Sequence, residues 1–104
     1  MSVRLLPEWL VLSIWRALLG EIYPAIRAIA ISFSSSRELT IRYYLDREPT
    51  QYDFDSIDVL LTNILTGAPE GQRIEAAFDE CIRSESRLKD LDVLDGLVYA
   101  RREY

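Results

Sequence analysis

The chain contains no histidine, one cysteine and four scattered glycines. Without histidine it lacks the usual general base at neutral pH and the commonest neutral metal ligand, and Ser-His and Cys-His nucleophile systems are excluded. The lone Cys81 can supply neither an internal disulfide nor a cysteine metal cluster. The glycines do not form the phosphate-binding P-loop pattern. The sequence therefore predicts a protein without enzymatic activity, cofactor or metal.

The chain also lacks a long uninterrupted apolar run. Its most apolar segment, WLVLSIWRALLG, is preceded by Glu8 and interrupted by Arg16, so its uncharged part is well short of the roughly 18 residues that a membrane span needs. No secretory signal peptide is evident, and a single cysteine fits a reducing compartment. We therefore expect a cytoplasmic protein with no membrane partner.

Acidic residues outnumber basic ones. Seventeen Asp and Glu against twelve Lys and Arg give a net charge of -5. Such a surface repels phosphate backbones, which argues against direct nucleic-acid binding, and it attracts basic partners. Mild acidity for solubility alone is an equally good explanation. At 104 residues with 49% hydrophobic residues, the chain is expected to fold as one domain spanning residues 1–104.

Apolar residues recur at helical spacing in two segments. The first predicted helix runs from Pro7 to about Gly20 or Ile22, and its apolar face is broad enough to predict that it is well buried. The second runs from Thr50 to Leu65 and begins with a capping-box-like pair formed by Thr50 and Asp53.

Apolar residues alternate in two further segments, Ala25–Phe33 and Arg37–Arg47, which the polar turn Ser34–Ser36 joins into a predicted β-hairpin. A last short strand is expected over Leu97–Arg101. The segment Arg73–Arg83 fits a strand or a helix about equally well, and we favour the strand because a hairpin needs further strands to be stable.

The order of predicted elements is helix, strand, strand, helix, strand, strand. This order indicates an α+β fold, in which an antiparallel sheet of about four strands carries two α-helices on one face.

Carboxylates are the only groups left that could carry catalysis, as they do in glycosidases. The sequence does not place any two candidates at a working distance, and helix caps or solvated surface account for them more simply. The candidates are Glu48, Asp53, Asp55, Glu75 and Asp79.

An aromatic pair followed by acidic residues points instead to binding. Tyr43 and Tyr44 must lie on opposite faces of their strand, and Tyr44 is expected to be exposed or covered by neighbouring groups. Tyrosine is favoured at interface hot spots, although ordinary cross-strand pairing with Tyr99 or Arg42 would also explain the ring. The predicted partner-binding residues are Tyr44, Asp46, Glu48, Asp53 and Asp55. The segment Asp90–Asp95 forms a second acidic stretch.

Three strings resemble a family of small bacterial immunity proteins that accompany polymorphic toxins of the colicin and contact-dependent growth inhibition kind. They are SIWRALLGEIYPAIRAIA, LTIRYYLDREPTQYDFDSID and LDVLDGLVYARREY, and the resemblance covers the chain from Ser13 onward. It implies a cytoplasmic protein that binds and neutralises one cognate toxin domain, and it carries over no catalytic residues. Many such toxins are basic nucleases, which an acidic inhibitor would suit. A homo-oligomeric or adaptor subunit and a carboxylate enzyme remain as alternatives.

Overall fold

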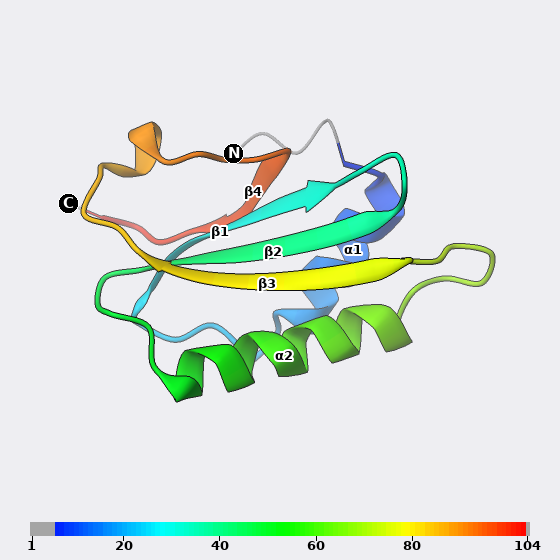
Figure 1. The fold of residues 1–104 in the computed structure, drawn as a ribbon, viewed down its shortest axis with the longest axis horizontal. Helices are drawn as coiled ribbons and strands as arrows, with labels where there is room; N and C mark the ends of the chain where they lie inside the picture. Colours follow the sequence, from blue (N-terminus) through cyan, green and yellow to red (C-terminus); the bar gives the residue numbers. More distant parts are fainter. Residues whose placement is uncertain (1–5, 104) are drawn as a thin grey trace.

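Among the residues that the structure describes, two helices and four strands follow one another in the order α-β-β-α-β-β, which confirms the predicted order. The computed structural model describes residues 6–103 and is drawn in Figure 1. A short 3-10 helix, η1, precedes the last strand. The elements are α1 (Glu8–Ala17), β1 (Ile26–Phe33), β2 (Glu38–Leu45), α2 (Gln51–Thr66), β3 (Ala76–Arg83), η1 (Leu88–Asp90) and β4 (Gly96–Ala100).

The four strands form one sheet in the order β3-β2-β1-β4. β1 is antiparallel to both β2 and β4, but β2 and β3 run parallel, so the expectation of an antiparallel sheet is wrong for this pair. The reason is the connection between them. α2 runs back along the sheet from the end of β2 to the start of β3, and a helical return of this kind joins parallel strands.

Both helices pack on the same face of the sheet, as predicted (Figure 1). The core between them is built from the alternating side chains of β1 and β2 and from the apolar stripes of the helices. Its fully buried members include Leu10, Ile14, Ile29, Ile31, Ile41, Tyr43, Ile57, Leu60 and Ile64. The segment Arg73–Arg83 contributes β3, which resolves the ambiguity in favour of the predicted strand.

The opposite face of the sheet holds a smaller apolar cluster. Ala28, Ala30 and Tyr44 are buried there beneath the chain that leads through η1 to β4, whose Leu91 and Leu97 complete the cluster. This segment includes the second acidic stretch, Asp90–Asp95. It is a cover for part of the second face.

Helix α1 is shorter and more exposed than predicted. It ends at Ala17, with Leu18 as its C-cap, because the chain then turns through Gly20 at φ +81°, a left-handed conformation that glycine adopts without strain. Its apolar surface is wider than its contact with the sheet. Leu12 and Trp15 therefore remain exposed, as does Leu19 in the turn after the helix, which corrects the prediction of a well-buried helix.

In the part of the chain that the structure describes, neither helix is long and apolar enough to cross a membrane.

Candidate functional site

The predicted partner-binding residues lie around the corner between β2 and α2, but two of the five are in the interior. Tyr44 is only 5% exposed. Its hydroxyl donates to the carbonyl of Asp92 at 2.7 Å and accepts from Arg42 Nη1 at 3.1 Å, while the Arg42 guanidinium lies 5.8 Å from the ring centroid. The ring is therefore covered by its neighbours, because the segment before β4 folds over it, and the unbound protein does not display it as an anchor.

Asp53 is completely buried and organises the corner. Its carboxylate accepts from Arg47 Nη1 at 2.6 Å, from the Tyr23 hydroxyl at 2.6 Å and from the Thr50 backbone N–H at 2.7 Å. The last bond belongs to the predicted capping box, in which Asp53, the third residue of α2, accepts from the backbone N–H of the N-cap residue Thr50. Burial alone would raise the pKa of Asp53, but the Arg47 ion pair and these hydrogen bonds outweigh it and hold the pKa well below its usual range.

The other three predicted residues are at the surface, each with a different neighbour. Asp46 pairs with Arg101 at 2.7 Å. Glu48 pairs with Arg83 at 3.3 Å and its side chain is 76% exposed. Asp55 accepts from Gln51 Nε2 at 2.9 Å. The structure thus gives these acids separate partners at the C-terminal segment, at the end of β3 and on α2, and does not gather them into one cluster.

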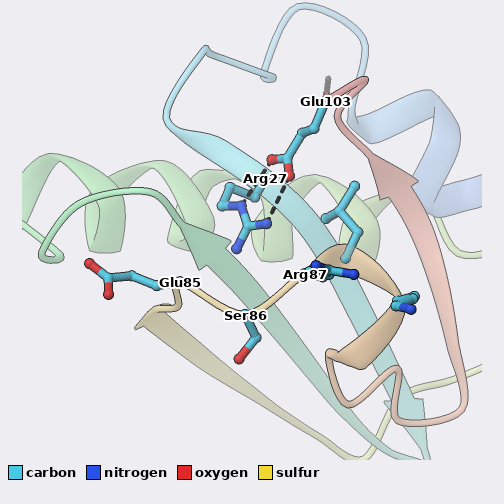
Figure 2. Close-up of a pocket in the computed structure, with 7 residues that line it drawn as sticks. Arg27, Glu85, Ser86, Arg87 and Glu103 are labelled. Carbon is cyan, nitrogen blue, oxygen red and sulfur yellow. Dashed lines mark hydrogen bonds and ion pairs between the residues drawn. The ribbon is translucent and has the colours of Figure 1, made fainter.

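A recess of about 570 Å³ opens beside the chain that connects β3 to η1 (Figure 2). At its base is Arg27, which occupies the point where the pairing of β1 with β2 shifts register. Arg27 is only 7% exposed, and each of its three guanidinium nitrogens donates a hydrogen bond. It donates to both carboxylate oxygens of Glu103 at 2.9 and 2.8 Å and to the carbonyl of Ser84 at 2.9 Å. Glu85, Ser86, Arg87, Leu88 and Lys89 form the rest of the lining.

A C-terminal ion-pair network that the sequence did not predict joins Arg27, Glu103, Arg101 and Asp46. Arg101 pairs with Glu103 at 2.8 Å as well as with Asp46, so the network ties the end of the chain to β1 and to the end of β2. The two arginines, led by the hydrogen bonds from Arg27, lower the pKa of Glu103 to about 2. An arginine inside the buried, apolar β1 was the one sequence signal of this network.

The Cys81 thiol and the possible metal ligands were the other candidates for a chemical role. Cys81 packs against the core, and burial, with the nearby carboxylates of Asp53 and Asp79, raises the pKa of its thiol to about 12. The thiol therefore stays protonated at neutral pH, and a protonated thiol is a poor nucleophile. Within residues 6–103, histidine, cysteine and acidic side chains form no group that could hold a metal ion.

A comparison with known protein families found a match over nearly the whole chain. The model of the family described as "MafI2 immunity protein" matches residues 7–103. The chain belongs to the MafI2 immunity protein family. The resemblance to immunity proteins is thereby confirmed, but the type is MafI2 and not the colicin or contact-dependent growth inhibition type.

Membership in the MafI2 family also settles the question of catalysis. Immunity proteins are inhibitors and not catalysts, which removes the carboxylate enzyme from the alternatives. A comparison with curated proteins found no match.

Proposed function

We propose that this MafI2 protein binds the toxin domain of a cognate MafB protein in the cytoplasm and neutralises it by forming a tight one-to-one complex. The family match over residues 7–103 is the observation that carries the proposal, because an immunity protein implies a toxin partner. The toxin that fits best is a basic nuclease. A net charge of -5 favours encounter with a basic protein, and it repels nucleic acid, so this protein would not itself bind the substrate of a nuclease.

The acids of the β2–α2 corner support the electrostatic part of this proposal. Glu48 and Asp55 are exposed and are proposed to meet basic side chains of the toxin, together with Asp46 after it releases Arg101. Tyr44 and Asp53 are buried, so they contribute by holding this corner in shape. Exposed ion pairs of this kind are worth about 0–1 kcal/mol each, and their main effect is on the rate of association.

The proposal is tested by mixing the purified protein with the purified toxin domain of the cognate MafB protein. Size-exclusion chromatography should show a one-to-one complex. Binding kinetics should show that raising salt from low to physiological concentration reduces the on-rate more than it raises the off-rate, because salt screens the steering field. If the two proteins do not associate, the proposal fails. If they associate at a rate indifferent to salt, the acidic surface has no part in binding.

A further inference from the structure

The two edge strands of the sheet are protected to different degrees. β4 has five residues and pairs with β1 through a register shift. Trp15 Nε1 of α1 donates to the carbonyl of Val98 in β4 at 3.2 Å, so part of this edge is occupied. β3 has eight residues in continuous register with β2. No element within residues 6–103 pairs with its outer side. An edge of this kind presents unpaired backbone N–H and C=O groups that another strand can bind.

Two large apolar side chains stand along the β3 edge on the sheet face opposite the helices. Phe78 is 51% exposed and Ile82 is 37% exposed. Their register partners are Thr40 and Tyr44 of β2, which places both side chains on the same face. They are four residues apart, with only Glu80 between them on that face, and Arg42 pairs with Glu80 at 2.9 Å.

On the helix-covered face of the sheet, α2 also places apolar side chains beside the β3 edge. It contacts β3 more extensively than β2. One flank of α2 carries Tyr52 and Val59, which line a recess together with Glu21 of the loop after α1. The opposite flank faces the outer side of β3, since the two flanks lie on either side of the buried stripe. This flank carries Phe54 and Leu65, both exposed.

Acidic side chains lie among these apolar groups. Asp79 of β3 is exposed, and Asp58 is exposed on α2 between Phe54 and Leu65. Neither makes an ion pair with another described residue, whereas Asp46 and Glu48 do. The β3 edge is therefore complemented by a chain that offers backbone hydrogen bonds, apolar side chains and positive charge.

We propose that the outer edge of β3 receives an extended, basic strand of the toxin domain, which adds a fifth strand to the sheet. This inference rests on the proposed function and names the surface that carries it out. Main-chain hydrogen bonds would supply affinity, and the side chains that border the edge would supply specificity. Glu48 pairs with Arg83 at the end of β3, so the acids of the β2–α2 corner extend the same surface.

A second copy of this chain fits the β3 edge less well than a basic strand does. Two β3 strands related by a two-fold axis would pair antiparallel, with residues of the same face opposite one another. If the two strands pair along their full length, the two-fold axis passes through Asp79 or Glu80 at the middle of β3. The carboxylate of that residue then lies directly opposite the same carboxylate of the second copy. Like charges directly opposite one another are destabilising.

Hydrogen–deuterium exchange of the free protein and of the complex with the toxin domain tests the proposal without any substitution. The amides of β3 that point away from β2 exchange readily when no strand covers them. In the complex they should exchange at least about ten-fold more slowly, because each then donates to a backbone carbonyl of the toxin. The outer face of α1, which carries Leu12, and the turn after α1, which carries Leu19, should show no such change.

Matched substitutions give a second measurement. Phe78→Ala should raise Kd about 30-fold, the effect of truncating a hot-spot side chain, while Leu19→Ala in the turn after α1 should change it less than about three-fold. Asp79→Lys should raise Kd about ten-fold or more. Asp90→Lys makes the same charge change at another exposed acid and should have little effect. Circular dichroism establishes that each variant is folded.

Three results would overturn the proposal. A complex that forms without protecting β3 would place the contact elsewhere and leave the proposed function intact. Failure to form any complex would overturn both. Protection of β3 in the free protein that increases with its concentration would show that a second copy occupies the edge.

Discussion

Asp53 shows how one buried carboxylate holds a corner of the molecule together. It pairs with Arg47, caps the start of α2 and accepts a hydrogen bond from Tyr23 in the loop after α1. Charge-assisted hydrogen bonds are among the stronger ones in proteins, and a buried group left without its partner is costly. The same residue was predicted to be both a helix cap and a contact for the partner. The structure shows the cap, and the contact remains a prediction.

We expect Asp53→Ala to lower the free energy of unfolding by about 2–4 kcal/mol, because it removes the cap and leaves Arg47 and the Tyr23 hydroxyl without their acceptor. Chemical denaturation measures the loss. Asp58→Ala, which removes an exposed acid from the same helix, is the matched control and should change stability by less than about 0.5 kcal/mol. Equal losses in the two variants would contradict the role assigned to Asp53.

The lowered pKa values of Asp53 and Glu103 predict acid sensitivity. A carboxyl group whose pKa is lower in the folded state stabilises the protein above its unfolded pKa, and this stabilisation is lost as pH falls through the folded pKa. For Glu103 the folded pKa is about 2, and that of Asp53 is also lowered. The free energy of unfolding should therefore decrease as pH is lowered from about 5 to about 2.

Glu103→Gln should flatten this pH dependence. Urea denaturation at a series of pH values provides the comparison, and Glu70→Gln is the control because Glu70 is exposed and makes no ion pair with a described residue. If Glu103→Gln leaves the slope between pH 5 and pH 2 unchanged, the C-terminal ion-pair network does not contribute to stability in the way described.

At the scale of elements, α2 has two functions. Its buried stripe seals the core beneath β2 and β3, and it carries the chain back so that β3 can run parallel to β2. The apolar periodicity of Thr50–Leu65 predicted the helix correctly. It could not predict the parallel pairing, because strand direction depends on where the helix docks and not on the pattern within any one segment.

Ile57 and Leu61 are buried in the stripe of α2 that faces the sheet. We expect Ile57→Ala and Leu61→Ala each to lower the free energy of unfolding by about 2–5 kcal/mol, because each leaves a cavity that the surrounding core fills only in part. Val59→Ala, at an exposed position of the same helix, is the control. Losses below about 0.5 kcal/mol at both buried positions would contradict the packing of α2 against the sheet.

At the scale of the whole molecule, local sequence patterns predicted the helices and strands, whereas contacts between residues far apart in the sequence determine which side chains are exposed. The hairpin and the Thr50–Asp53 cap could be predicted from neighbouring residues. The local pattern of Arg73–Arg83 fitted a helix about as well as a strand, and only the hairpin's need for further strands favoured β3. The burial of Tyr44 depends on the carbonyl of Asp92, 48 residues away. The pairing of Arg27 with Glu103 spans 76 residues. Nothing in the local sequence specifies either contact.

The same limit explains the candidate site. The sequence indicated that acids and an aromatic side chain would serve binding, and it placed both near the end of β2. Which side chains are exposed depends on how the segment before β4 covers the sheet and on which strands are left at its edges. The open edge of β3, with Phe78 and Ile82 beside it, became evident only from the strand order.

Growth of bacteria that produce the cognate MafB toxin domain tests the central claim most directly. The account predicts that producing the full chain together with the toxin domain restores growth, and that the toxin domain co-purifies with the chain at about one-to-one stoichiometry, as a tight complex requires. Growth arrest that persists while the chain is present, folded and in excess over the toxin domain would contradict the assignment of this protein as the inhibitor of that toxin.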